Sequence, residues 1–146
     1  MEAYYNLIYR YNEDRLFEIR HRGYLNLSLR ETFGAYTLSW RGRVQGTLRD
    51  ERVGEYKTNP KYMMKNRLQI EYSIFGSPWQ PYLSGELSSE LNNPMGNELT
   101  RIRFQGGTSW RLNRTDYLDF FLRWDEYLEF KEPRVLSVGI GFKRRF

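Results

Sequence analysis

The stretch YTLSWRGRVQGTLR, residues 36–49, divides its side chains between two faces. Alternate residues of a β-strand point to opposite sides of the sheet, so a period of two indicates a strand with two different environments. The apolar face of this stretch consists of Tyr36, Leu38, Trp40, Val44 and Leu48. The polar face consists of Thr37, Ser39, Arg41, Arg43, Gln45 and Thr47. The stretch therefore predicts a strand that meets an apolar medium on one side and charged groups on the other.

The same alternation runs along almost the whole chain, and helical spacing of apolar residues is hard to find. Clusters of Gly, Pro, Asn and Asp interrupt the alternation and mark the strand ends. The predicted strands cover residues 3–11, 16–30, 35–49, 63–75, 80–91, 99–112, 117–130 and 134–146. We therefore expect one all-β domain over residues 1–146, an antiparallel up-and-down transmembrane β-barrel of about eight strands.

The segments between the predicted strands alternate in kind. Tight, hairpin-like turns are predicted at 31–34, 76–78 and 113–116, and these would share one rim of the barrel. The connections at 12–14, 50–62, 92–97 and 131–133 would form the other rim. Short turns on one rim, with both termini beside them, are typical of bacterial outer-membrane barrels. Because lipid offers no partner to an open strand edge, we expect the first strand to pair with the last.

Three features of the sequence favour an apolar face that points outward, against lipid. Arginine outnumbers lysine, and its planar guanidinium can make several fixed hydrogen bonds to carboxylates in a crowded lumen. Acidic residues share a face with the arginines, as buried charges require. Tyr and Trp gather on the apolar face, as in the aromatic girdles of membrane barrels. The residues predicted to face lipid are Leu38, Trp40, Leu68, Ile70, Ile102, Phe104, Trp110, Val138, Ile140 and Phe142.

The polar face is predicted to form an ion-pair network in the lumen. Its members are Glu18, Arg20, Arg22, Arg41, Arg43, Arg67, Glu71, Glu86, Glu90, Arg101, Arg103, Asp119, Arg123 and Asp125. An eight-stranded barrel is just wide enough for side chains to fill it, so we expect no conduction of solutes. A larger barrel or an oligomer would instead place the arginines along an anion-preferring pore.

Part of the sequence resembles an uncharacterised family of bacterial outer-membrane β-barrel proteins, classified as a domain of unknown function. The resemblance rests on NRLQIEY (66–72), SPWQPYLSGEL (77–87), residues 97–103 and VGIGF (138–142) with Phe146. It is close over 66–146 and looser through Arg20, His21 and Arg22. It implies the fold and a location in the bacterial outer membrane, and it carries no known reaction or cofactor. A final phenylalanine on an alternating strand is also similar to the assembly signal of such barrels, which gives Phe146 that expected role.

Composition narrows the remaining classes of function. The 146 residues include no cysteine, which excludes disulfides and thiolate sites, and no apolar run approaches the ~20 residues of a membrane-spanning helix. The net charge of +5 and 17% aromatic residues would suit a nucleic-acid binder. In a nucleic-acid platform, however, basic and aromatic residues share one face, and here they lie on opposite faces. The expected partners are outer-membrane lipid and the barrel assembly machinery, with a partner subunit as a further candidate and no nucleic acid.

The carboxylates and the histidine do not predict an enzyme. Glu86 and Glu90 are four residues apart on one strand, ~13 Å, which exceeds the separation used by glycosidases. Glu71 and Glu86 could still meet across strands, although a lumen ion pair is favoured for each. His21, the single histidine, and Ser28 fall on opposite faces of one strand, against a serine–histidine pair.

Two further alternatives concern glycines and orientation. Gly106 and Gly107 are interpreted as a strand bend or bulge, because no helix follows them to complete a phosphate-binding loop. The alternative to a membrane barrel is a soluble, lipocalin-like barrel whose apolar face points inward and encloses a lipophilic ligand. In that barrel the ligand would be wrapped by Tyr36, Leu38, Trp40, Phe104 and Trp110.

Overall fold

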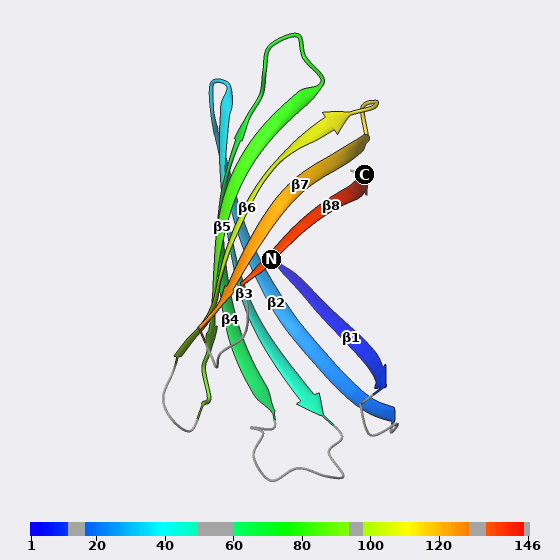
Figure 1. Ribbon diagram of the computed structural model, residues 1–146, viewed down its shortest axis with the longest axis vertical. Coiled ribbons are helices and arrows are strands. Elements are labelled where there is room, and N and C mark those ends of the chain that lie inside the picture. The colour runs from blue at the N-terminus through cyan, green and yellow to red at the C-terminus, as the bar shows by residue number, and fades with distance from the viewer. Residues whose placement is uncertain (12–16, 50–59, 94–97, 129–133, 145–146) are drawn as a thin grey trace.

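The computed structural model describes residues 1–11, 17–49, 60–93, 98–128 and 134–144, and these form eight β-strands without a helix. The strands are β1 (Glu2–Tyr11), β2 (Phe17–Phe33), β3 (Tyr36–Arg49), β4 (Lys61–Tyr72), β5 (Trp79–Glu90), β6 (Glu98–Arg111), β7 (Asp116–Tyr127) and β8 (Val135–Arg144). Every strand pairs antiparallel with the next one along the chain, in the order β1 to β8 (Figure 1). The predicted all-β, up-and-down architecture with eight strands is confirmed. Within the described ranges no helix is long and apolar enough to cross a membrane.

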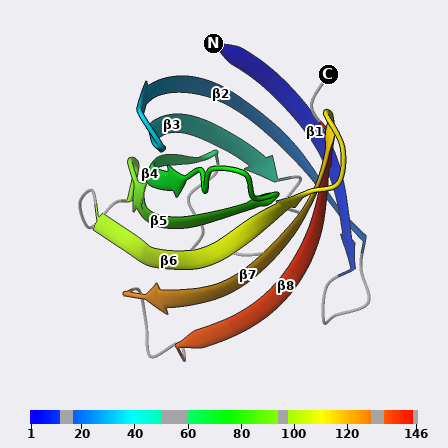
Figure 2. The same cartoon turned by 90° about the horizontal axis from the view of Figure 1, so that it is seen from above.

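The sheet curls strongly (Figure 2) but does not close, because β1 and β8 run apart from each other (Figure 1), and it forms a half-barrel. No Cα atom of β1 lies within 8 Å of a Cα atom of β8. The predicted pairing of the first strand with the last is therefore wrong for the described chain. Eight strands with this curvature do not bring the two edges together. Consequently, the outer edges of β1 and β8 present backbone groups that no other described strand satisfies.

Burial is inverted relative to a water-soluble protein. Among the described residues, the buried hydrophobic side chains are Tyr82 and Tyr117. The buried polar residues include Glu86, Asp119 and Asp125. Exposed apolar side chains occur on all eight strands, and Val138 of β8 is 81% exposed. The period-two pattern thus places charged groups on the concave face and apolar groups on the convex face.

The three short connections lie where the sequence predicts turns. The β2–β3 hairpin turns at Gly34 and Ala35, so the predicted turn at 31–34 is corrected, because residues 31–33 belong to β2. Gly34 has a φ of 58° that favours glycine. Between β4 and β5, Gly76 adopts a φ of 71°. In the β6–β7 turn, Asn113 Oδ1 accepts hydrogen bonds from the backbone N–H of Thr115 and of Asp116, at 2.9 and 2.8 Å.

The predicted longer connections fall largely outside the described residues, which exclude 12–16, 50–59, 94–97 and 129–133. The end of the predicted connection at 50–62 is corrected, because Lys61 and Tyr62 are the first residues of β4. Phe146, the expected assembly signal, also lies outside the described residues.

The glycine pair of β6 is regular strand, so of the predicted bend or bulge the bulge is wrong and the bend stays a prediction. Gly106 and Gly107 pair in register with both neighbouring strands, and the irregularity lies instead between Ser88 and Ser89 of β5. A Cβ atom on Gly107 would lie 2.4 Å from the carbonyl oxygen of Phe120 and 2.9 Å from the ring of Tyr82. The glycine is therefore needed because the large Tyr82 side chain lies across it on the concave face.

Candidate functional site

The register of the sheet aligns many of the charged side chains of the concave face in two rows. The first row crosses β3 to β7 and consists of Arg41, Arg67, Glu86, Arg103 and Asp125. The second row, two residues along each strand, consists of Arg43, Lys65, Ser88 and Arg101. Side chains that are directly opposite on paired strands have Cβ atoms about 5 Å apart, so each row brings its groups into interaction distance.

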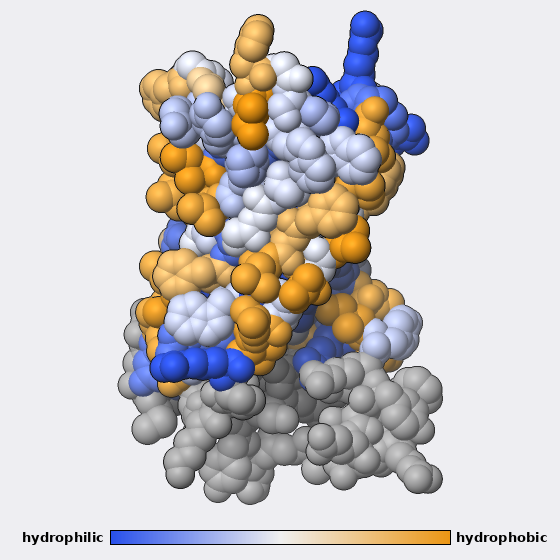
Figure 3. Space-filling model, turned by 45° about the horizontal axis from the view of Figure 1, so that its top comes forward, coloured by the Kyte–Doolittle hydropathy of each residue, from blue (hydrophilic) through white to orange (hydrophobic). Residues whose placement is uncertain are grey.

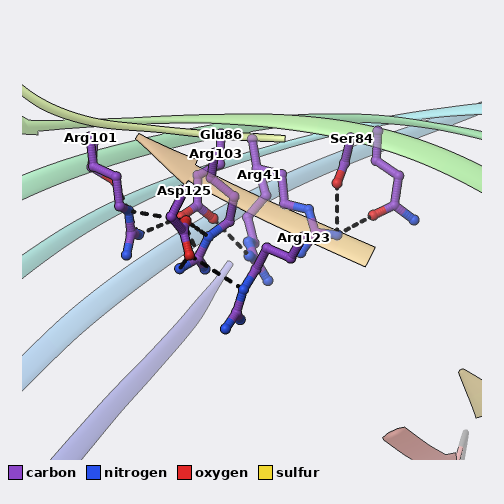
Figure 4. A network of polar contacts seen from close by, with 10 residues as sticks. Arg41, Ser84, Glu86, Arg101, Arg103, Arg123 and Asp125 are labelled. Atoms are coloured by element: carbon purple, nitrogen blue, oxygen red, sulfur yellow. Dashed lines mark hydrogen bonds and ion pairs between the residues drawn. The ribbon is translucent and has the colours of Figure 1, made fainter. Parts of the chain in front are cut away.

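Asp125 is the centre of one cluster, and it is 3% exposed. Arg103 contacts both of its carboxylate oxygens, through Nε to Oδ1 and through Nη2 to Oδ2 at 3.1 Å. Arg123 Nε lies 3.4 Å from Oδ2, and Arg101 Nε lies 4.0 Å from Oδ1. Figure 4 shows these guanidinium groups converging on the carboxylate. The bidentate geometry is the strongest form of such a contact.

Glu86 is the second centre and shares cations with Asp125. Arg101 Nη2 donates to its Oε1 at 3.0 Å, and Arg103 Nη1 lies 3.9 Å from the same oxygen. Arg41 Nη2 lies 3.8 Å from Oε2, from the opposite side of the carboxylate (Figure 4). Because both carboxylates are buried, these contacts supply the partners that desolvated charges require.

The other predicted acidic members pair elsewhere, so the network is divided into separate clusters. Glu71 accepts from Arg30 Nη2 at 3.0 Å, and Glu90 pairs with Lys61. Neither cation belongs to the predicted network, although both lie on the polar face of their strands. The alternation alone could have identified them.

Asp119 forms a third cluster around a tyrosine that sequence reasoning missed. Lys143 Nζ lies 3.1 Å from Asp119 Oδ1, and the hydroxyl of Tyr82 donates to Oδ2 at 3.0 Å. Gln105 in turn donates to the Tyr82 hydroxyl at 2.8 Å. The available signal was the position of Tyr82 on the polar side of the alternation, whereas the glycine opposite it appears only in the register of the sheet.

Two predicted arginines contact neutral groups and no carboxylate among the described residues. Arg43 Nε donates to Asn26 Oδ1 at 2.8 Å, and its guanidinium stacks 4.2 Å from the centre of the Tyr24 ring. Arg67 Nη2 donates to Gln69 Oε1 at 2.7 Å and to Ser84 Oγ at 3.2 Å. Among the described residues these two arginines therefore form no ion pair, and their predicted pairing stays a prediction.

The predicted arginines of β2 lie on the same face, and Arg22 Nε donates to Thr47 Oγ1 at 3.3 Å. Arg20 is two residues away on the same strand and also lies on the concave face. The side chain of Glu18 lies outside the described residues.

A polar pocket of about 230 Å³ opens between the two rows. Its lining consists of Arg41, Arg43, Lys65, Arg67, Glu86, Arg101 and Arg103. The six cationic side chains face one carboxylate of the lining, and Asp125 outside it balances Arg103, so the pocket carries an excess of positive charge. Lys65 is a further residue that sequence reasoning missed, although it lies on the polar side of β4.

The predicted lipid-facing residues all lie on the convex face. Eight are exposed, and Trp40 and Ile102 are half-buried. Apolar side chains spread over the middle of the face in Figure 3, and most of the strongly hydrophilic ones lie toward its upper and lower ends. Aromatic rings pair across strands on this face, with Trp79 stacked on Trp110 at 5.4 Å and Phe104 on Trp124 at 5.8 Å between ring centres.

The residues considered for catalysis are separated by the register. Glu71 is paired with Tyr82 and Glu86 with Arg67, so the two carboxylates are offset by four residues along the sheet. His21 lies on the convex face, where its Nδ1 is 2.6 Å from the hydroxyl of Tyr5. Within the described ranges, no group of three or more His, Asp or Glu residues could hold a metal ion.

No family model, curated protein or solved structure matches the chain. The resemblance of residues 66–146 to uncharacterised outer-membrane barrels therefore stays a prediction.

Proposed function

We propose that this chain is part of the wall of a β-barrel in the bacterial outer membrane. Its convex face contacts lipid, and its arginine-rich concave face borders an aqueous lumen. The observation that carries the proposal is the inversion of burial: apolar side chains are exposed on every strand while carboxylates are buried. Monomeric soluble proteins rarely expose continuous apolar patches larger than a few hundred Å², and a surface of this extent is instead suited to hydrocarbon.

Strand length supports the same conclusion. A tilted strand needs ~9–11 residues to cross the hydrocarbon core. The described strands have 10 to 17 residues. Each strand is thus long enough to span the membrane, and the backbone groups between neighbouring strands are satisfied within the sheet.

The open edges favour a pore over a filled lumen. In lipid, the outer backbone groups of β1 and β8 require further strands, either of a longer chain or of another subunit. A barrel that contains this half-barrel in its wall has more than eight strands, and its lumen is too wide for side chains alone to fill. Because cations predominate around the pocket, such a lumen would prefer anions.

Against the soluble, ligand-binding alternative stands the curvature of the sheet. That alternative needs Trp40 and Phe104 to enclose a ligand, yet both lie on the convex face. A lipophilic molecule could contact them there but would not be enclosed by the barrel.

The four tryptophans provide a direct test, because Trp40, Trp79, Trp110 and Trp124 all lie on the convex face. In vesicles that contain brominated phospholipid, tryptophan fluorescence should be strongly quenched, whereas a water-soluble quencher should have little effect. The folded protein should also need detergent and show heat-modifiable mobility on a denaturing gel. A detergent-free, monodisperse protein with unquenched tryptophans in the presence of these vesicles would contradict the proposal.

A further inference from the structure

The second row of the concave face is crowded with positive charge and has no carboxylate. Arg43 and Lys65 are directly opposite each other on β3 and β4, and Arg101 follows one strand beyond Ser88. In the first row, Arg41 and Arg67 are also directly opposite each other. Like charges at opposite positions of paired strands destabilise a sheet. The fold therefore holds four cations in two repulsive cross-strand pairs.

The hydrogen-bonding capacity of these cations is not used up. Among the described residues, Lys65 has no hydrogen-bond or ion-pair partner, and the buried Nε of Arg101 has no hydrogen-bond acceptor. Arg43 and Arg67 donate to neutral oxygens and not to carboxylates. One buried donor without an acceptor, together with three cations that pair with no described carboxylate, favours the binding of an acceptor with several oxygens.

The pocket between the rows gives these donors a common point of contact. It has a volume of about 230 Å³, enough for a small tetrahedral oxyanion with some water. Glu86 is the single carboxylate in its lining, and Arg41, Arg101 and Arg103 already share that charge. The excess charge consequently lies toward Arg43, Lys65 and Arg67.

We propose that this pocket binds a phosphoryl oxyanion, either free inorganic phosphate or the phosphate group of a small ester. Planar guanidinium groups bind phosphate oxygens in pairs, and Lys65 would add a point charge beside them. A multivalent anion would also remove the repulsion within both cross-strand cation pairs. The inference rests on the proposed function in one respect, since the pocket must open to an aqueous lumen.

Isothermal titration calorimetry on the chain folded in micelles of an uncharged detergent tests this inference, at low ionic strength and without chloride. Inorganic phosphate and glycerol 3-phosphate are the two titrants, and their relative affinities distinguish the two sources of the phosphoryl group. Lys65→Gln should weaken binding about tenfold, the effect of losing one charge-assisted hydrogen bond. Arg30→Gln removes one charge from the same face outside the pocket, so it should leave the affinity unchanged.

A substitution that removes negative charge should have the opposite effect, whereas the Arg30→Gln control distinguishes a binding site from general charge attraction. Glu86→Gln removes the one negative charge of the pocket lining, so phosphate should bind more tightly. If Lys65→Gln does not fold, Arg43→Gln on the adjacent strand gives the same comparison with Arg30→Gln. Absence of binding to the wild type by either titrant at tens of millimolar would overturn the inference, as would equal weakening by the pocket and control variants.

Failure of the site and failure of the proposed function give different results. Tryptophan quenching by brominated lipid without phosphate binding would support the proposed barrel wall and contradict the proposed phosphate site. Phosphate binding by a protein whose tryptophans stay unquenched would support the proposed phosphate site and contradict the proposed membrane location.

Discussion

Replacing Asp125 with asparagine should destabilise the sheet strongly. The carboxylate is 3% exposed and contacts Arg103, Arg123 and Arg101. Asparagine keeps the size of the side chain but removes the charge, which leaves Arg103 and Arg123 without their main counterion. Removing one partner of a buried ion pair costs ~3–5 kcal/mol. Because the arginine side chains are 17–32% exposed and retain some hydration, we expect a loss near the lower end, about 3 kcal/mol.

The assay is urea unfolding in lipid vesicles, followed by tryptophan fluorescence. Glu126→Gln is the matched control, since it changes the adjacent residue in the same chemical way. Glu126 pairs with Arg134 at 3.2 Å, but the two side chains are 27% and 73% exposed, so its loss should cost under about 1 kcal/mol. Equal effects of Asp125→Asn and Glu126→Gln on the free energy of unfolding would refute the buried-network reasoning.

Three other perturbations test the faces, the packing and the lumen. Leu38→Arg should reduce insertion into vesicles far more than Ser39→Arg, because a cation on the lipid side costs ~2–4 kcal/mol, and equal insertion yields would show that the faces are misassigned. Gly107→Ala should lower the free energy of unfolding by ~1–3 kcal/mol in urea, because its Cβ would lie 2.4 Å from a backbone carbonyl oxygen. Gly106→Ala should lower it less, because the nearest atom to its Cβ is a leucine methyl at 3.1 Å. In planar bilayers a salt gradient should give a reversal potential of anion-preferring sign, and Glu86→Gln should increase that preference; a cation preference would contradict the charge reading of the lumen.

The local alternation of apolar and polar residues was sufficient to predict the eight strands and the composition of both faces. Residues 36–49 already showed apolar and charged side chains on opposite sides, and β3 has that arrangement in the structure. Side-chain direction in a strand depends only on position modulo two, so it can be read without tertiary contacts. The short turns were predictable for a similar reason, because Gly34, Gly76 and Asn113 act within their own segments.

Pairing between particular charges could not be obtained in this way. Whether Glu71 meets Arg30 or Arg67 depends on register, on side-chain reach and on irregularities such as the shift at Ser88. The importance of Tyr82 likewise appears only when Gly107 of the neighbouring strand is placed opposite it. Such contacts join residues that are far apart in the chain, and no local pattern encodes their distances.

By itself, the sequence determined that this protein is an up-and-down sheet with one apolar and one charged face, because the two-residue period of a strand is a local property. Only the tertiary structure decided that the sheet stops at a half-barrel and that its cations converge around one pocket. Curvature is the accumulated twist and stagger of all eight strands, and closure depends on their number and shear rather than on any single segment.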